Sequence, residues 1–114
     1  MKSGKAFVIL WEFQVRPGFE PVFERVYSPK GDWAQLFSKA EGYFRTELNR
    51  DVKNRGRYLT MDVWESERAY LKFHETYANE YRAVDQRCEE LTQKETALGT
   101  FETVTADFVT GTET

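Results

Sequence analysis

The stretch of the sequence with the most chemical potential is YLTMDVWESERAYLKFH, residues 58–74, which contains Asp62, Trp64 and the single histidine, His74. A histidine titrates near neutral pH and can serve as a proton shuttle or general base. An aspartate set among aromatic rings has its pKa raised by desolvation and can then accept a proton from a phenolic substrate. Asp62 and His74 are therefore the candidate catalytic residues.

Both candidates have a structural alternative. Asp62 could instead form a cross-strand ion pair with Arg45, and this interpretation is the favoured one. His74 lies about 100° from Phe73 around a helix, at the edge of the buried stripe, where a histidine is commonly a hydrogen-bonded or partly exposed residue. No serine or cysteine nucleophile pattern accompanies it.

Aromatic residues make up 16% of the chain, and a subset of them can meet between the first strand and a long helix. Such a set either fills a core or forms a flat pocket for a ring system, and the sequence leaves both open. In the second case the candidate substrate-binding residues are Trp11, Phe13, Phe73, Tyr77 and Tyr81. Trp33 could cover such a pocket or anchor its own segment, and anchoring is favoured.

Composition and charge exclude several classes of protein. The net charge is −3 and there is no block of Lys and Arg, which argues against a nucleic-acid partner. The apolar run 6–11 is too short to cross a bilayer and no signal-peptide pattern precedes it, so we expect a cytoplasmic protein without a membrane partner. Cys88 cannot form an intrachain disulfide and is expected in the core.

Metal and phosphate sites are not expected either. One histidine and one cysteine cannot supply the usual ligands of zinc or haem chemistry, so no metal and no cofactor is predicted. The glycines are too far apart to form a phosphate-binding loop.

The elements that must position these residues follow from periodicity. Alternating apolar residues predict strands over 7–15, 43–51 and 57–65, with hairpin chemistry at Asn54 and Gly56. Helical spacing predicts a helix beginning near residues 18–20, a short one capped by Asp32, and an amphipathic stripe of about 22 residues that follows the N-cap Ser66, with a kink or break at 78–79. A last strand is predicted over 100–109, after Gly99.

This order, βαββαβ, predicts an α+β fold of the ferredoxin-like type, with an antiparallel sheet and helices on one face. We expect one domain over residues 1–114, with its core at about 6–109. The other sheet face would carry Val8 and Leu10, joined by Leu59, Met61 and Val63 in one of the two phases of that strand. An exposed apolar face favours a homodimer that closes sheet against sheet.

At this point the chain resembles the antibiotic biosynthesis monooxygenase family of the dimeric α+β barrel superfamily. The resemblance rests on the order of elements, on LTMDVWESERAY at the strand–helix junction, and on GDWAQLF followed by GY. It implies a ligand pocket between helices and sheet, and it leaves the reaction open.

The haem-degrading branch of that superfamily has a Trp and a His ten residues apart on a helix and an Asn on the first strand. Trp64 and His74 have the same separation, but Trp64 precedes the predicted helix cap. Counted from the junction, the Trp and His of that branch fall on Phe73 and at about Ala83, and counted back from Arg16-Pro17-Gly18 its Asn falls on Trp11. The sequence therefore argues against haem degradation.

The resemblance implies a cofactor-independent monooxygenase-like protein that acts on an aromatic or polyketide-like small molecule, with His74 or Asp62 as the base. The alternatives are a non-catalytic homodimer that binds a small ligand or has a stress-related role, and an isomerase or decarboxylase-like enzyme on the same scaffold. An enclosed, partly polar cavity reached by Asp62 or His74 would favour the enzymes, and a filled aromatic core with both residues in solvent would exclude them.

Overall fold

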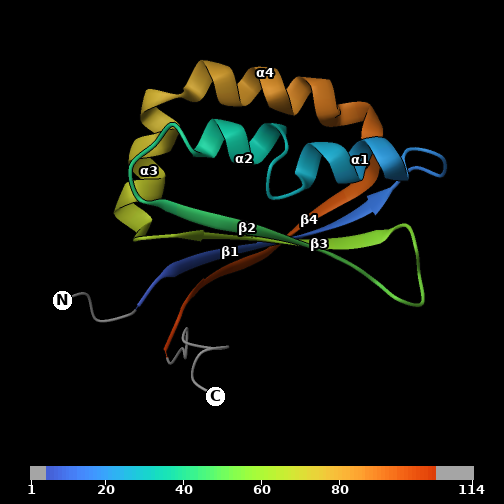
Figure 1. The fold of residues 1–114 in the computed structure, drawn as a ribbon, viewed down its shortest axis with the longest axis horizontal. Helices are drawn as coiled ribbons and strands as arrows, with labels where there is room; N and C mark the ends of the chain where they lie inside the picture. Colours follow the sequence, from blue (N-terminus) through green and yellow to red (C-terminus); the bar gives the residue numbers. More distant parts are fainter. Residues whose placement is uncertain (1–4, 105–114) are drawn as a thin grey trace.

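A computed structural model describes residues 5–104 of the chain. It has a four-stranded antiparallel sheet with the order β2-β3-β1-β4. The elements are β1 (Phe7–Val15), α1 (Glu20–Tyr27), α2 (Asp32–Phe37), β2 (Tyr43–Arg50), β3 (Arg57–Trp64), α3 (Glu67–Thr76), α4 (Ala78–Cys88), the 3₁₀ turn η1 (Glu89–Leu91) and β4 (Thr92–Glu102). The helices all lie on one side of the sheet, and α4 runs across the outside of that layer (Figure 1). The predicted α+β ferredoxin-like fold is confirmed.

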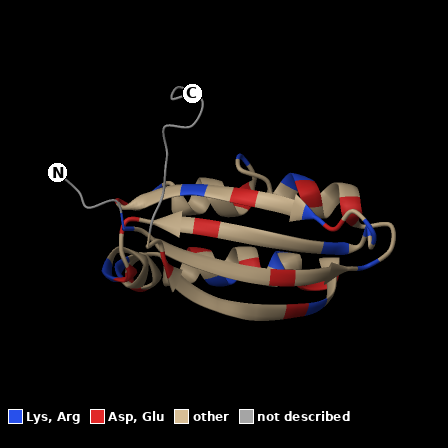
Figure 2. Ribbon diagram, turned by 90° about the horizontal axis from the view of Figure 1, so that it is seen from below, with Lys and Arg blue, Asp and Glu red and all other residues tan. Residues whose placement is uncertain are grey.

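The register of the strands decides which side chains face the helices. Ile9 pairs with Asp62 and Trp11 with Thr60, so β1 and β3 present these residues on the same, helix-covered face. Val8, opposite Val63, and the neighbouring pair Leu10 and Met61 lie on the other face. Of the two possible phases of β3, the structure has the one that places apolar side chains on the open face of the sheet. Figure 2 looks at that side of the sheet, where long stretches of strand carry no charge.

The core lies between the helices and the inner sheet face and is mostly aromatic. Its fully buried side chains come from two strands and two helices; the largest are Trp64, Tyr58, Phe23, Phe73 and Val15. Rings pack in tilted and edge-on pairs, as between Phe37 and Phe73, whose centroids lie 5.3 Å apart at 83°. Cys88 is buried, as expected. Large rings let this short chain fill a core with few residues.

The junction after β3 confirms the interpretation of Trp64 as a strand residue. β3 ends at Trp64, and the Ser66 side chain accepts a hydrogen bond of 3.1 Å from the Ala69 backbone N–H, which caps α3. The stripe that follows breaks at Tyr77 into α3 and α4, at the place where the sequence suggested a kink.

Two predicted boundaries are wrong. The last strand begins at Thr92, eight residues before the predicted start, and its predicted part beyond residue 104 lies outside the described residues. Gly99 does not interrupt this strand. It lies inside β4 with a φ of +136°, beside the register shift between Leu10 and Trp11. The residue preceding α2 is Gly31 rather than Asp32: a Cβ at Gly31 would come within 2.3 Å of two α1 carbonyl oxygens.

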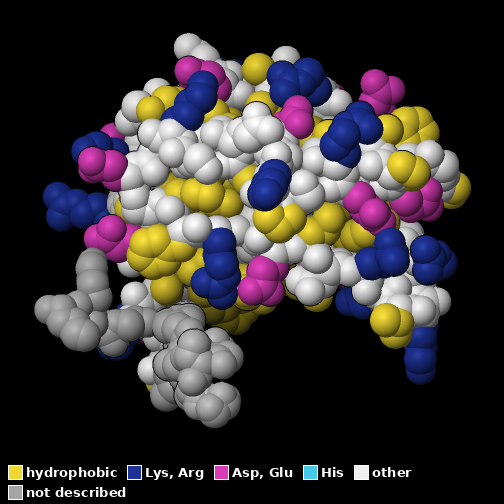
Figure 3. All heavy atoms as spheres, in the orientation of Figure 1, with side chains coloured by type: hydrophobic (Ala, Val, Ile, Leu, Met, Phe, Trp, Pro, Cys, Tyr) yellow, Lys and Arg dark blue, Asp and Glu magenta, His cyan; other side chains and the backbone are white. Residues whose placement is uncertain are grey.

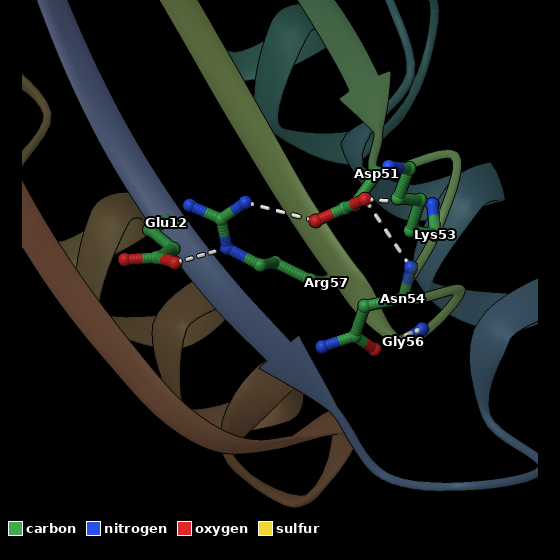
Figure 4. Close-up of polar contacts among 6 residues, drawn as sticks. All are labelled: Glu12, Asp51, Lys53, Asn54, Gly56 and Arg57. Atoms are coloured by element: carbon green, nitrogen blue, oxygen red, sulfur yellow. Dashed lines mark hydrogen bonds and ion pairs between the residues drawn. The ribbon is translucent and has the colours of Figure 1, made fainter.

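The hairpin between β2 and β3 is held by its own polar groups (Figure 4). The Asp51 carboxylate accepts backbone hydrogen bonds of 2.8 Å from Lys53 and 3.2 Å from Asn54. Arg57 binds Asp51 at 2.9 Å and also pairs with Glu12 across the sheet. These contacts fix the register of β3, and therefore the face on which Asp62 lies.

Charged side chains of both signs are spread over the surface. On the face shown in Figure 3, basic and acidic side chains are interspersed over most of the molecule, and several basic side chains lie near one another at its lower right end. In the part of the chain that the structure describes, no helix combines the length and apolar character needed to cross a membrane.

Candidate active site

A cavity of about 200 Å³ lies between the helical layer and the inner face of the sheet. Its walls come from all four strands and from α1, α2 and α4; they are Trp11, Phe13, Tyr27, Trp33, Phe37, Thr46, Thr60, Asp62, Tyr81, Asp85 and Glu95. The cavity is thus aromatic on most sides, with two threonines and three carboxylates as its polar groups.

Asp62 is the candidate base that reaches this cavity. It is half-buried, and its Oδ1 accepts a hydrogen bond of 2.7 Å from the Thr46 hydroxyl on β2. Desolvation raises the pKa of Asp62 to about 6, while the Thr46 hydrogen bond acts in the opposite direction by favouring the carboxylate. A carboxylate with this pKa is ionised at neutral pH and is more basic than an exposed one.

The prediction of an ion pair between Asp62 and Arg45, which the sequence favoured, is wrong. Asp62 is paired in register with Thr46, so Arg45 lies one residue away and on the opposite face of the sheet. Arg45 pairs instead with Glu47, at 3.4 Å.

A short chain of hydroxyl groups links Asp62 to the edge of the sheet. Thr46 gives its single hydroxyl proton to Asp62, so the 2.6 Å contact between the Tyr43 and Thr46 hydroxyls has Tyr43 as donor. Tyr43 is half-buried. The chain Tyr43–Thr46–Asp62 therefore fixes the orientation of the carboxylate in the cavity wall.

His74 does not line the cavity. Its Nε2 lies 2.7 Å from the Tyr70 hydroxyl and its ring centroid is 4.6 Å from that of Tyr81. Burial lowers the pKa of His74, so the imidazole is neutral at neutral pH. The pKa of Tyr70 is raised by burial and also by the negative charge of Asp62. Tyr70 therefore interacts with both candidate bases, through a hydrogen bond with His74 and electrostatically with Asp62, but only Asp62 borders the cavity.

The five candidate substrate-binding aromatics divide into two groups. Trp11, Phe13 and Tyr81 line the cavity. Phe73 is fully buried in the core behind it, with its ring centroid 6.3 Å from that of Tyr81. Tyr77 packs on Phe73 and donates its hydroxyl to the Lys39 carbonyl at 3.2 Å. Part of the aromatic set is a pocket wall, and part of it is core.

Sequence reasoning missed several wall residues: Tyr27, Phe37, Thr46, Thr60, Asp85 and Glu95. Thr60 could have been found, because it alternates with Asp62 on one strand face. Asp85 and Glu95 could not, because their helix and strand meet only in the tertiary fold.

Trp33 is both anchor and wall. It packs against Tyr27, Phe37 and Tyr81, which confirms its anchoring role. Its indole N–H is enclosed and makes no hydrogen bond within residues 5–104, so the ring and not the N–H is what Trp33 offers to the cavity.

The arrangement can perform proton transfer in a small apolar space. The acidic side chains stand apart from one another, and within residues 5–104 no group of three or more His, Cys, Asp or Glu side chains is placed to hold a metal ion. What the cavity offers is carboxylates of which two, Asp62 and Glu95, have a raised pKa, hydroxyl groups that can donate to an oxygen, and flat walls.

Solved structures share this fold. A variant of SnoaB, a cofactor-independent oxygenase from Streptomyces nogalater, has a TM-score of 0.68 and 19% identity over 89% of this chain and 95% of that one. A proposed antibiotic biosynthesis monooxygenase from Bordetella bronchiseptica has a TM-score of 0.65 and 18% identity, over 90% and 98% of the two chains. A NIPSNAP family protein from Agrobacterium tumefaciens has a TM-score of 0.58 and 16% identity, over 90% and 95%. At these identities the likeness establishes the fold alone.

Sequence comparison establishes the family. No curated protein is significantly similar to the chain in sequence. The model of the family described as antibiotic biosynthesis monooxygenase, however, matches residues 6–87, which include β1 to β3, the first three helices and most of α4. The protein belongs to the antibiotic biosynthesis monooxygenase family.

Proposed function

We propose that this protein is a cofactor-independent monooxygenase of small aromatic or polyketide-like compounds, with Asp62 as its general base. The observation that carries the proposal is a half-buried carboxylate, with its pKa raised to about 6, in the wall of an aromatic cavity. The family supports the reaction class, and SnoaB, a structure of the same fold, is named as a cofactor-independent oxygenase.

The chemistry would draw its electrons from the substrate. Asp62 removes a proton from an acidic C–H or phenolic O–H, and the resulting carbanion transfers electrons to O₂ and forms a C–O bond. The hydroperoxide that results after reprotonation loses water and leaves a carbonyl group. One oxygen atom enters the product, and the other leaves as water with two hydrogens of the substrate. Asp62 thus has to be ionised at the start of each turnover.

The walls would position the ring. Trp11, Phe13 and Tyr81 provide flat apolar contact, and the Thr60 and Tyr81 hydroxyls can donate to a substrate oxygen that gains negative charge. Phe73 acts indirectly in this proposal, because its ring packs against Tyr81, and Tyr77 in turn packs on Phe73. A cavity of about 200 Å³ is smaller than the 300–1,000 Å³ typical of sites for drug-sized ligands, which favours a compact ring system.

The test is oxygen consumption with anthrone, comparing Asp62→Asn with His74→Ala. The amide of Asp62→Asn can still accept the Thr46 hydrogen bond but cannot take a proton, so we expect a loss of about 10²–10⁴-fold in rate. His74→Ala should retain activity within about fivefold, because His74 does not border the cavity and contacts its wall only through the ring of Tyr81. Equal losses in both variants, or an active Asp62→Asn, would contradict the assignment of the base.

The same proposal predicts a pH profile. The rate should rise with pH through about 6, because the fraction of ionised Asp62 rises there. A rate that is flat between pH 5 and pH 8 would remove Asp62 from the mechanism, whatever the activity of the variants.

We also propose that the protein forms a homodimer through the open sheet face. Val8, Leu10 and Met61 point away from the helices, and Phe101, opposite Val8 on β4, is 49% exposed. A contiguous apolar face of this kind is typical of an interface.

A further inference from the structure

The charged groups of the cavity wall are all acidic. Asp62 lies on β3, Asp85 on α4 and Glu95 on β4, so three separate elements each contribute one carboxylate. Within residues 5–104 no Lys, Arg or His side chain lines the cavity, and none forms an ion pair with these three carboxylates. The nearest arginine along α4, Arg87, is paired with Asp32.

All three carboxylates act on one side chain of the cavity wall, Tyr81. Burial raises the pKa of Tyr81, and the charges of Asp85, Asp62 and Glu95 all raise it further, so the Tyr81 hydroxyl senses all three. The pKa of Glu95 is raised by desolvation and then by Asp85 and Glu89, while the Thr92 hydroxyl acts in the opposite direction. The surroundings of these carboxylates are therefore poor in compensating positive charge.

The remaining walls suit a cation as well. The indole and phenol rings of Trp11, Trp33, Tyr27 and Tyr81 border the same space, and the negative face of an aromatic ring attracts an organic ammonium group. The carboxylates do not converge as metal ligands within the described residues, which makes a molecular cation the better match to their spacing.

We infer that the cavity selects aromatic substrates that carry a protonated amine and discriminates against substrates that carry a carboxylate. This inference rests on the proposed function for the identity of the site, and it adds the charge of the substrate. The amine would lie between Asp85 and Glu95 at the α4–β4 side of the cavity, while the ring extends toward Asp62.

The register allows this division of roles. Asp62 is opposite Ile9, and Glu95 is opposite Phe13 on the other side of β1. Four residues along a strand and two strand spacings separate their Cα atoms by roughly 16 Å. The charged end and the reacting end of one small molecule can therefore face different carboxylates.

Three probes of nearly equal size separate charge from shape: tyramine (cationic), tyrosol (neutral) and 4-hydroxyphenylacetate (anionic). Binding to the full chain is measured by calorimetry or by tryptophan fluorescence, with no turnover needed. We expect tyramine to bind about tenfold more tightly than tyrosol, and 4-hydroxyphenylacetate to bind most weakly, since a cation–π contact and partly screened charge pairs each contribute a few-fold. Raising the salt concentration should reduce the preference.

Two variants test whether Asp85 and Glu95 cause the preference for tyramine over tyrosol. Glu95→Gln should weaken tyramine binding about threefold, and the double variant Asp85→Asn with Glu95→Gln should bring tyramine within about twofold of tyrosol. Tyrosol binding should not change. Glu90→Gln is the matched control, because Glu90 is exposed on η1 and lies outside the cavity wall.

The outcomes distinguish this inference from the proposed function. Equal binding of tyramine and tyrosol, a preference that survives in the double variant, or binding of none of the probes would overturn it. Oxygen consumption with neutral anthrone could still occur in each of these cases. A preference for tyramine without any oxygenation would uphold the inference and reject the oxygenase.

Discussion

At the scale of single residues, Asp62 is held in an environment that opposes its charge. The strand pairing that places it against Ile9 and Thr46 also puts its carboxylate in an aromatic cavity with one hydroxyl donor. An aspartate with its pKa raised to about 6 costs folding free energy whenever it is ionised. Such a cost at a cavity wall is typical of functional sites.

This cost predicts a pH-dependent gain in stability for Asp62→Asn. Between the unfolded pKa of about 3.8 and the folded pKa of about 6, the folded state binds more protons, so stability of the native protein falls as the pH rises. Above pH 6 the full penalty applies. We expect Asp62→Asn to increase the free energy of unfolding by about 1–2 kcal/mol at pH 8, after allowance for partial exposure, and by much less at pH 4.

Urea unfolding at pH 4 and pH 8 measures the free energy of unfolding of Asp62→Asn and of the native protein. The control is Asp85→Asn, which removes an exposed carboxylate from the same cavity wall and should leave stability within about 0.5 kcal/mol at both. A stabilisation of Asp62→Asn that is equal at pH 4 and pH 8 would show that ionisation of Asp62 is not its origin.

At the scale of elements, the loop before β2 lies very close to the start of α3. The Gly42 carbonyl accepts a hydrogen bond of 2.6 Å from the Glu65 N–H, and Gly42 has a φ of +91°. A Cβ at Gly42 would lie 2.6 Å from the Cβ of Ala69 on α3. A residue without a side chain is therefore required here by both backbone conformation and close approach.

Alanine substitutions at Gly18 and Gly42 separate the cost of backbone strain from the cost of close approach. Gly18 has nearly the same φ, +92°, but a Cβ there would meet nothing within 4 Å. Gly18→Ala should cost about 1–2 kcal/mol from backbone strain alone. Gly42→Ala should cost at least about 1 kcal/mol more, because α3 must also shift. Chemical denaturation gives both values, and equal costs would show that the approach to Ala69 is not tight.

At the scale of the whole molecule, the helices within residues 5–104 cover one face of the sheet and none of them lies on the other (Figures 1 and 2). The uncovered face carries apolar side chains from β1, β3 and β4, and these are Val8, Leu10, Leu59, Met61 and Phe101. A second copy would remove this surface from water, and the hydrophobic free energy scales with the area removed.

The proposed dimer predicts that Leu10→Glu is a monomer. A buried charge facing its own symmetry mate opposes association, whereas in the monomer it lies on an open surface. Light scattering coupled to size exclusion should give twice the chain mass for the native protein and the chain mass for the variant. Leu71→Glu is the control, since Leu71 is 54% exposed on α3, away from the open face, and should leave the mass unchanged. A monomeric native protein would reject the dimer.

The sequence by itself determined the kind and order of the elements, because period-two and helical spacing are local properties of the chain. In FVILWEFQV every second residue from Phe7 to Val15 is apolar and the residues between them are mixed, which predicts β1. Ser66 ends the pattern of β3 and caps α3, so these elements also follow from neighbours in the chain. The start of the last strand is predicted too late, because Gly99 suggests a break before the strand, whereas in the structure it lies inside β4 at a register shift. The residues that begin β4, Thr92 to Thr96, are all polar and therefore give little apolar signal.

Only the tertiary structure decided the site. Whether Asp62 faces Thr46 or Arg45 depends on register, and a shift of one residue moves a side chain to the opposite face of the sheet. Whether an aromatic ring borders a cavity or fills the core depends on the positions of whole helices, which separated Tyr81 from Phe73 on one predicted stripe. Asp85 and Glu95 joined the wall from distant parts of the chain, because a cavity is formed by long-range packing that no local pattern records.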